Sequence, residues 1–428
     1  MIFYPKHDII KMDKGKEDRK MHQVITLKVR LKPTSQQAQA FEKVSETYRD
    51  ACNVVSQWYF DHHFKMSRKD FNHKLYHPLR KQFPEMNSAM VQSTYRTIVA
   101  RYDAVGTQIK QRSTYVPSGK VNAQGKEVWE PVKRDLDWLW NPIHFKRPQA
   151  DYVRKLNYSF VQNASKISLN VLSKRIKVDF DKYYLETLLD PNVKLGTAKL
   201  VKACGKWYLH VSLTRVIPDL LKDSEIKRVV GIDRGLRFLV TAFDSKQQTR
   251  FVSGKQIVAK RRHYKALRAQ LQQCKSSSAR QRLKKIGHKE NRWMSDVNHQ
   301  LSKALIDYYG PETLFVLEDL TGVKQEVKHR KRENRYEQSS WAFYELEQDL
   351  EYKALANHCK VLKVPAQYTS QRCPRCGRIN KANRDHQKHL YVCDRCSYQS
   401  NDDRIGAMNI YQLGLMVRNG DVQVKFIK

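Results

Sequence analysis

Four cysteines near the end of the chain constrain its fold more than any other feature. They form two Cys-x-x-Cys pairs, separated by sixteen residues, at Cys373, Cys376, Cys393 and Cys396. This spacing is typical of four thiolates that close tetrahedrally on one Zn²⁺ ion. Two disulfides would require an oxidising compartment, and a redox-active Cys-x-x-Cys usually occurs once in a chain. The sequence therefore predicts one structural zinc site.

The composition is strongly basic. The chain has 428 residues, and 80 Lys and Arg against 43 Asp and Glu give it a formal net charge of +37. Such an excess repels itself unless a polyanion neutralises it, which indicates a nucleic-acid partner. We find no apolar run near the ~18 residues of a membrane-spanning helix, and the first residues lack the apolar core of a signal peptide. We expect a cytosolic protein of several domains with reduced thiols.

The first half of the chain reads as a β domain that receives a helical insertion. Apolar residues alternate in QVITLKVRLKPT, which predicts a strand, and Thr34 with Gln37 forms a capping box for a long helix. A second helix is expected from about Ser88. Later segments alternate again, and the Cys204-Gly205 pair predicts a hairpin turn.

Three acidic residues stand at the ends of predicted buried elements. Two follow apolar strands, and one begins an amphipathic helix. Asp233 ends the apolar strand RVVGID, Glu318 follows the apolar run TLFVL, and Asp403 begins a helix in DDRIGAMNIYQ. Each acid alone could equally be a turn residue or face solvent. Together, three carboxylates would repel one another unless cations lay between them. Two Mg²⁺ ions about 4 Å apart would meet that need and would support hydrolysis of a phosphodiester.

The motifs of this chain resemble those of a known family. GIDRG, VLEDL, YTSQRCPRCG, YVCDRC and DDRIGAMNI, in this order, resemble the RuvC-type nuclease core and zinc ribbon of TnpB, a transposon-encoded RNA-guided nuclease related to compact type V CRISPR effectors. The likeness extends from about Gln23 to about Gly414. The residues that match the family's catalytic, Mg²⁺-binding acids are Asp233, Glu318 and Asp403. The residues that match its zinc ligands are Cys373, Cys376, Cys393 and Cys396.

The third acid departs from the usual family pattern, D-x-N-A-A-x-N-I. Ile405 and Gly406 stand where Asn and the first Ala are common, whereas the residues that keep the register are Ala407, Asn409 and Ile410. The register selects Asp403 over Asp402. We therefore expect Asp402 to face solvent at the start of the helix and to stabilise the helix dipole.

The resemblance implies a multidomain α+β fold. We expect a wedge-type β-barrel with an inserted helical domain, followed by an RNase H-like (RuvC) α/β nuclease domain with an inserted four-cysteine zinc ribbon. The expected segments are a flexible lead at 1–22, a wedge-like β domain at 23–34 and 113–225, a helical recognition domain at 35–112, a RuvC-like nuclease domain at 226–365 and 402–414, a zinc-ribbon insertion that binds target nucleic acid at 366–401, and a C-terminal tail at 415–428.

The resemblance also implies a function. We expect an RNA-guided DNA endonuclease that cuts guide-complementary double-stranded DNA beside a short adjacent motif, as a monomeric ribonucleoprotein with its guide RNA in the prokaryotic cytosol or nucleoid. A compact type V CRISPR effector and an RNA-guided DNA-binding repressor with little cleavage are the alternatives. Basic segments from Lys260, Ser278 and Val327 are expected to line a positive channel for nucleic acid. The presence of all three acids favours cutting.

Overall fold

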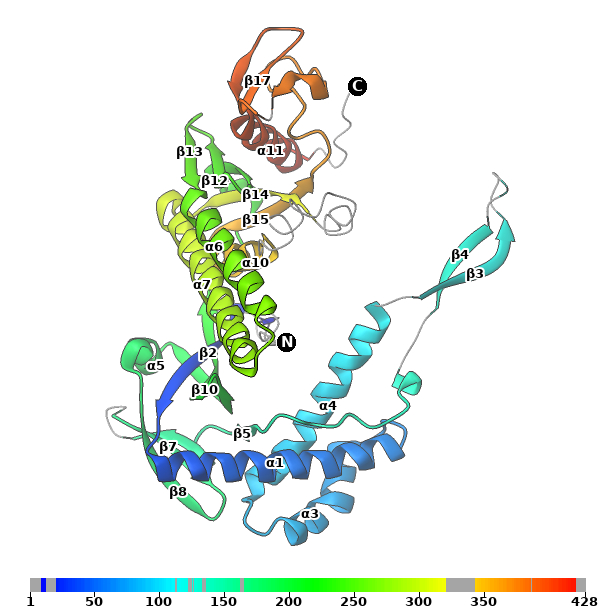
Figure 1. Ribbon diagram of the computed structural model, residues 1–428, viewed down its shortest axis with the longest axis vertical. Helices are drawn as coiled ribbons and strands as arrows, with labels where there is room; N and C mark the ends of the chain where they lie inside the picture. Colours follow the sequence, from blue (N-terminus) through cyan, green and yellow to red (C-terminus); the bar gives the residue numbers. More distant parts are fainter. Residues whose placement is uncertain are drawn as a thin grey trace. The chain divides into compact units, whose positions relative to one another are not determined.

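The protein consists of two compact units (Figure 1). The computed structural model describes residues 9–12, 21–111, 114–121, 125, 127–132, 136–161, 165–320, 343–385 and 387–420. The first unit contains Val24–Val216, and the second contains Ile10–Gln23 and Ile217–Lys428. The main division therefore falls between Val216 and Ile217, before the boundary at 225/226 that the sequence predicts. Most of the predicted lead at 1–22, the basic segment from Val327 and the end of the predicted tail, 421–428, lie outside the described residues.

An eight-stranded sheet nearly closes into a barrel. Its strand order is β5-β9-β10-β2-β8-β7-β6, and β1 pairs with β2 outside this order. An isolated β-bridge between Arg154, which follows β5, and Tyr158 of β6 links the two end strands of the sheet. The strands are β1 (Ile9–Met12), β2 (Met21–Lys32), β5 (Ala150–Tyr152), β6 (Tyr158–Phe160), β7 (Ile167–Val171), β8 (Lys174–Phe180), β9 (Val193–Ala203) and β10 (Lys206–Ile217). Within the predicted lead at 1–22, the structure has β1, which pairs with β2, and the first two residues of β2.

Helices and barrel strands of the first unit share one core. Tyr48 and Tyr102, from α1 and α4, lie in the same hydrophobic cluster as Val29 of β2 and Leu209 of β10. The predicted capping box at Thr34 is confirmed. The helices are α1 (Ser35–Asp61), α2 (Arg68–Asp70), the π-helix η1 (Phe71–Leu75), α3 (Tyr76–Gln82), α4 (Ser88–Gln111), the 3-10 turns η2 (Leu136–Trp138) and η4 (Lys182–Tyr184), and α5 (Leu185–Leu189).

The hairpins of the first unit include β9–β10 and the pair formed by β3 (Thr114–Val121) and β4 (Glu127–Val132). The predicted hairpin is confirmed: Ala203 pairs with Lys206, and Cys204 and Gly205 take positive φ angles of 50° and 74°, as a tight two-residue β-turn requires. A second hairpin contains the segment PSGK at 117–120, whose Pro and Gly are typical of loops. This segment lies within strand β3, which pairs with β4.

A five-stranded sheet forms the centre of the second unit. Its order is β13-β12-β11-β14-β15, antiparallel from β13 to β11 and parallel from β11 to β15. One face packs on α7 and α10 through residues such as Phe315, and the other packs on α11 through residues such as Val316. The elements are η5 (Asp223–Glu225), β11 (Arg228–Asp233), β12 (Phe238–Asp244), β13 (Thr249–Ser253), α6 (Lys255–Gln273), α7 (Ser277–Tyr309), β14 (Thr313–Asp319), α10 (Phe343–Ala356), β15 (Lys360–Pro365) and α11 (Asp402–Arg418).

A small module separates β15 from α11. It contains a three-stranded sheet and the four predicted zinc ligands. Its elements are η7 (Lys381–Asn383), β16 (Arg384–Asp385), β17 (Leu390–Val392) and β18 (Gln399–Asn401). We call residues 366–401 the cysteine module. Helix α11 ends at Arg418, so it continues into the segment that the sequence predicts as a tail from residue 415.

Helix α11 approaches the central sheet very closely. A Cβ atom on Gly231 of β11 would lie 2.3 Å from the carbonyl oxygen of Ala407, and one on Gly414 would lie 2.3 Å from a methyl carbon of Val316. The neighbours of Gly231 are backbone atoms, which cannot rotate away. Glycine at this position therefore sets the distance between helix and sheet.

We expect Gly231→Ala to lower the free energy of unfolding by about 1–3 kcal/mol, or to prevent folding, because the helix must move away from the sheet. Chemical denaturation measures this change. Gly287→Ala is the matched control, since it lies inside α7 and, apart from the adjoining backbone of its own helix, no atom of the described residues lies within 4 Å of its added Cβ. There the same substitution should stabilise the helix by up to about 1 kcal/mol. Equal stabilities of both variants would contradict the packing argument.

Candidate active site and metal centre

The first two predicted acids leave neighbouring parallel strands at the same edge of the sheet. Strand β11 pairs with β14 in a register that places Ile232 opposite Leu317. The next residues are Asp233 and Glu318, so their side chains lie at the carboxyl ends of adjacent strands. This edge is where α/β proteins usually bind ligands. The structure therefore brings together two acids that stand far apart in the sequence.

The third predicted acid comes to this edge from helix α11. Asp403 lies in the first turn of the helix, and Asn401 caps that turn by accepting hydrogen bonds from the backbone N–H groups of Asp403 and Arg404. Three residues further on, a Cβ on Gly406 would lie 2.7 Å from a carboxylate oxygen of Asp233. The first turns of α11 thus lie directly against the Asp233 carboxylate.

The three acids influence one another electrostatically. Burial raises the pKa of Asp233 well above its ordinary value, and the charges of Glu318 and Asp403 raise it further. Burial also raises the pKa of Glu318 and that of Asp403. Negative charges that are partly desolvated and close to one another need a cation. Carboxylate oxygens are the ligands that Mg²⁺ prefers, so this donor set fits the predicted magnesium ions.

Two neighbouring residues fix the position of Glu318. The hydroxyl of Thr369 donates a hydrogen bond to its carboxylate, which lowers the pKa of Glu318 against the effect of burial. The buried guanidinium of Arg234 donates to the backbone oxygen of Glu318 at 2.6 Å and to Glu347 of α10 at 3.0 Å. The GIDRG motif therefore supplies both an acid and a residue that holds the next strand.

Arg384 is a functional candidate that sequence reasoning missed. It comes from β16 of the cysteine module, and its Nη2 lies 3.6 Å from Oδ1 of Asp403. Its positive charge lowers the pKa of Asp233, Glu318 and Asp403, opposing the effects that raise them. No motif marks it, because one arginine among 80 basic residues carries no local signal.

Asp402 corrects the sequence prediction. It was expected to face solvent, but it is only 1% exposed and its carboxylate pairs with Arg384, with Nε to Oδ2 at 3.0 Å. The helix still begins at this residue. Burial follows because Arg384 and His389 of the cysteine module contact Asp402, a tertiary arrangement that the helix pattern does not contain.

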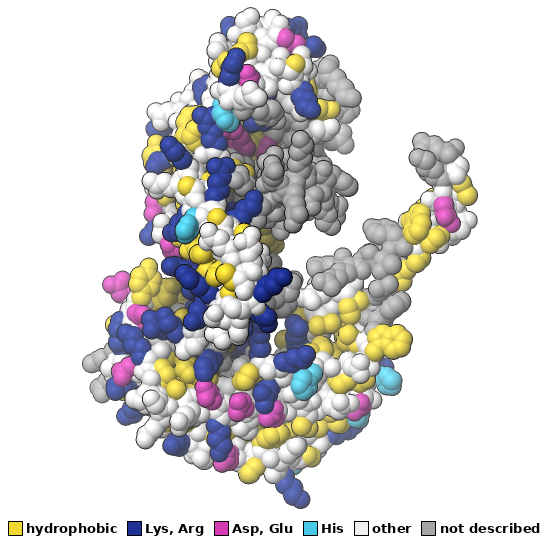
Figure 2. All heavy atoms as spheres, in the orientation of Figure 1, with side chains coloured by type: hydrophobic (Ala, Val, Ile, Leu, Met, Phe, Trp, Pro, Cys, Tyr) yellow, Lys and Arg dark blue, Asp and Glu magenta, His cyan; other side chains and the backbone are white. Residues whose placement is uncertain are grey.

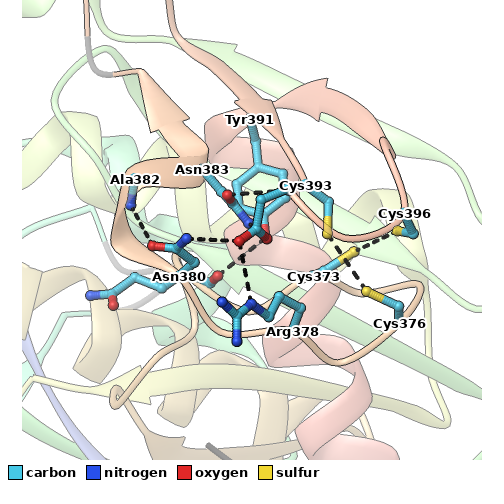
Figure 3. A network of polar contacts seen from close by, with 11 residues as sticks. Cys373, Cys376, Arg378, Asn380, Ala382, Asn383, Tyr391, Cys393 and Cys396 are labelled. Carbon is cyan, nitrogen blue, oxygen red and sulfur yellow. Dashed lines mark hydrogen bonds and ion pairs between the residues drawn. The ribbon is translucent and has the colours of Figure 1, made fainter.

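The four predicted zinc ligands converge on one point (Figure 3). Cys373 and Cys396 have their Sγ atoms 3.6 Å apart, as do Cys376 and Cys393, and all four atoms lie within 4.8 Å of one another. A tetrahedral Zn²⁺ ion with Zn–S bonds of about 2.3 Å requires sulfur atoms about 3.8 Å apart. The same distances are too long for disulfide bonds. The cluster therefore fits one zinc ion.

Equivalent turns support the two cysteine pairs. The backbone N–H of Gly377 donates to the backbone oxygen of Cys373, and that of Ser397 donates to the backbone oxygen of Cys393, each at 3.0 Å. Both residues take positive φ angles, 77° for Gly377 and 55° for Ser397. Around them Asp394 accepts hydrogen bonds from Arg378, Asn380 and Asn383, which lower its pKa to about 2. Figure 3 shows this network beside the sulfur atoms.

The cysteine module is bonded to the helix that carries Asp403. The buried side chain of Asn409 donates to the backbone oxygens of Thr369 and Arg372 at 2.7 and 2.8 Å, and Gln412 donates to that of Pro374 at 3.0 Å. Ile405 packs in the same small hydrophobic cluster as two of the cysteines. Displacement of the module would therefore disturb both α11 and the Thr369 contact to Glu318.

The helical pair α6 and α7 presents a basic surface. Between Lys255 and Arg292 the only acidic residue is Glu290. Its side chain is buried and pairs with Arg268, while Nε of Arg261 lies 3.9 Å away. The surface of this pair therefore carries positive charge, and Figure 2 shows Lys and Arg side chains over the helices. Two of the three predicted basic segments lie here.

Among the described residues, no helix combines the length and the apolar character needed to cross a bilayer.

The acid cluster predicts a pH effect on the metal-free protein. Because the pKa of Asp233 is raised above 3.8, the folded state keeps its proton to higher pH than the unfolded chain does. The free energy of unfolding in EDTA should therefore fall as the pH rises from about 4 through the raised pKa. Asp233→Asn should make this fall smaller, since Glu318 and Asp403 still contribute to it, and should be more stable at neutral pH by about 1–3 kcal/mol.

Urea denaturation in EDTA at several pH values measures this effect. Asp296→Asn is the control, since Asp296 is an exposed residue of α7 and its loss changes the net charge equally. Added Mg²⁺ should stabilise the wild type and leave Asp233→Asn nearly unchanged. Parallel stability curves for wild type and Asp233→Asn would contradict the proposed repulsion.

Known proteins match this chain over most of its length. Residues 343–410 match the family model described as "Cas12f1-like, TNB domain", and residues 210–326 match the one described as "Probable transposase". The CRISPR-associated endodeoxyribonuclease Cas12f1 of Sulfoacidibacillus thermotolerans is 27% identical over 364 residues, which cover 78% of this chain and 79% of the relative. A TnpB-like protein of Methanocaldococcus jannaschii is 28% identical over 131 residues, 30% of this chain and 46% of that protein.

A solved structure also resembles this one. In the cryo-EM structure of a Cas12f1-sgRNA-target DNA complex, the protein aligns with a TM-score of 0.50 and 12% sequence identity, over 87% of this chain and 81% of that chain. At this identity the likeness concerns the fold alone. The family models and the named relatives fit the TnpB family, as the motifs of the sequence predict.

Proposed function

We propose that this chain is an RNA-guided DNA endonuclease of the TnpB type, with an RNase H-like (RuvC) nuclease domain at 226–365 and 402–414. The observation that carries the proposal is the convergence of Asp233, Glu318 and Asp403 at one edge of the central sheet, where burial and mutual repulsion raise the pKa of Asp233. These are the conditions under which carboxylates hold divalent cations.

The proposed chemistry is hydrolysis of a DNA phosphodiester. Two Mg²⁺ ions held by the three carboxylates would activate a water and stabilise the leaving oxygen. Thr369 and Arg234 hold Glu318 in place through the contacts to its carboxylate and its backbone oxygen. Arg384 adds a fixed positive charge next to Asp403, which would favour an anionic phosphate at the site.

The nucleic-acid partners follow from charge and from the relatives. The formal charge of +37 and the basic surface of α6 and α7 suit a phosphate backbone. One relative is named an endodeoxyribonuclease, and the similar solved structure contains sgRNA and target DNA. We infer that this chain binds a guide RNA that pairs with target DNA, while the protein holds the duplex by its backbone and shape.

Purified protein with its co-purified RNA and Mg²⁺ should cut a plasmid that matches the guide. Asp233→Asn, Glu318→Gln and Asp403→Asn should each lower the cleavage rate on the order of a thousandfold or more, and each should still bind the plasmid. Asp296→Asn is the control with the same change of charge. Gel analysis of cleavage and a filter-binding assay measure the two properties.

The same experiment separates the alternatives. An RNA-guided repressor would bind the matched plasmid and leave it intact while an active relative cuts in parallel. A nonspecific basic protein would carry random cellular RNA, whereas a guided nuclease would carry one abundant RNA with a variable guide. Both a TnpB nuclease and a compact type V effector would pass these tests. A transposon end or a repeat array beside the coding region distinguishes these two.

Zinc is proposed to support the nuclease site through the cysteine module. Cys393→Ser should lower the cleavage rate by about 10- to 100-fold although Asp403 is untouched, because the module holds α11 and Thr369 in place. Zinc content by atomic absorption and single-turnover cleavage measure the effect. Cys274→Ser is the control, since Cys274 is exposed at the end of α6 and is not one of the four clustered cysteines. Cleavage at the wild-type rate by a zinc-free Cys393→Ser protein would refute this coupling.

A further inference from the structure

Asp402 is a buried acid next to the third site residue, and it has two defined partners. Its Oδ2 accepts a hydrogen bond from Nε of Arg384 at 3.0 Å, and its Oδ1 accepts one from the backbone N–H of Asp403 at 3.0 Å. Only 1% of its side chain is exposed. A carboxylate this deeply buried is stable only with a charged partner. The pair joins the cysteine module to the start of α11.

The ion pair with Asp402 anchors one edge of the Arg384 guanidinium. Its Nε binds Asp402, while Nη2 lies 3.6 Å from Oδ1 of Asp403, longer than a hydrogen bond. Its side chain is 20% exposed. A guanidinium is planar and offers several N–H groups in a fixed fork, so one anchored edge orients the other edge. The edge that carries Nη2 thus lies beside Asp403 without a hydrogen bond to it.

We propose that Asp402 is a positioning residue, whose buried carboxylate fixes the guanidinium of Arg384 beside the three acids so that it faces the bound phosphate. The proposal rests on the proposed nuclease function. Without Asp402, an arginine side chain would retain several rotamers, and the nearby carboxylates would attract its charge directly. Arg384 would then move closer to Asp403 than the present 3.6 Å and compete with the metal ions for the same oxygens.

His389 offers a different role for Asp402. Its Nδ1 lies 3.6 Å from Oδ1 of Asp402, and the ligand atoms of His389, Asp402 and Asp403 lie within 4.8 Å of one another, so the three could hold a metal ion. The guanidinium of Arg384 already occupies the other oxygen of Asp402 at 3.0 Å. A second cation there would be repelled by it. The observed ion pair therefore favours positioning over metal binding.

A double-mutant cycle in the guide-loaded protein tests the proposal. We expect Asp402→Asn to lower the single-turnover cleavage rate by about 10- to 100-fold, the effect of losing one charge-assisted hydrogen bond. Arg384→Gln should lower it by at least as much. Adding Asp402→Asn to Arg384→Gln should cause no further loss, because Asp402 acts only through Arg384. Affinity for the matched DNA should stay within twofold throughout.

The cycle also identifies other roles of Asp402. If Asp402→Asn lowers the rate equally in both backgrounds, the residue acts through the fold or through its own metal ion, and the proposal is wrong. The Mg²⁺ concentration for half-maximal cleavage should be the same for Arg384→Gln and for the double variant. A higher concentration for the double variant would show that Asp402 binds metal and would overturn the proposal. Wild-type cleavage by Asp402→Asn would overturn it as well.

Controls separate this proposal from the proposed nuclease function. If the guide-loaded wild type does not cut, the nuclease function fails, whereas normal wild-type cleavage with an unaffected Asp402→Asn variant refutes only the positioning role. Asp296→Asn reports the effect of charge alone. Zinc content and thermal unfolding of each variant verify that the cysteine module is intact, and Asp402→Ser provides a second variant if Asp402→Asn does not fold.

Discussion

The close contact between helix α11 and strand β11 is the constraint on which the candidate site depends. At Gly231 the helix backbone lies where any side chain would stand, so the sheet and helix can meet at only one distance. That distance places the first turns of α11 against Asp233 and puts Asp403 beside the acids of two strands. A wider separation would leave the third acid outside the cluster, and the site would lose one of its three proposed metal ligands.

The cysteine module also contacts helix α11, through hydrogen bonds and an ion pair. It supplies backbone oxygens to Asn409 and Gln412, and it supplies Arg384 to Asp402. These contacts mean that the four cysteines do more than fold a small module on their own. They hold a segment whose residues touch both the end of β14, through Thr369, and the start of α11. A bound zinc ion would thereby determine the geometry of a site to which it contributes no ligand.

Charge explains the arrangement at two scales. Around the acids, a few cationic side chains offset negative charge that is partly removed from water, and Arg384 contacts both aspartates at the start of α11. Over α6 and α7, the opposite holds: the only acid between Lys255 and Arg292 is buried and ion-paired, which leaves positive charge at the surface. A nuclease needs both, since the backbone of its substrate is bound by cations and cut at metal-bound acids.

Much of this organisation could be read from local patterns. The alternation before Pro33, the capping box at Thr34, the Cys204-Gly205 turn and the Cys-x-x-Cys spacing each depend on neighbouring residues, and the structure has each of them. The strand-end positions of Asp233 and Glu318 are local as well. Burial of Asp402, the donation from Thr369 and the position of Arg384 could not be predicted, because each arises where segments distant in the chain meet. The sequence thus specified which groups are present, and tertiary packing, set by the space at Gly231 and the bonds of the cysteine module to α11, decided which of them face one another.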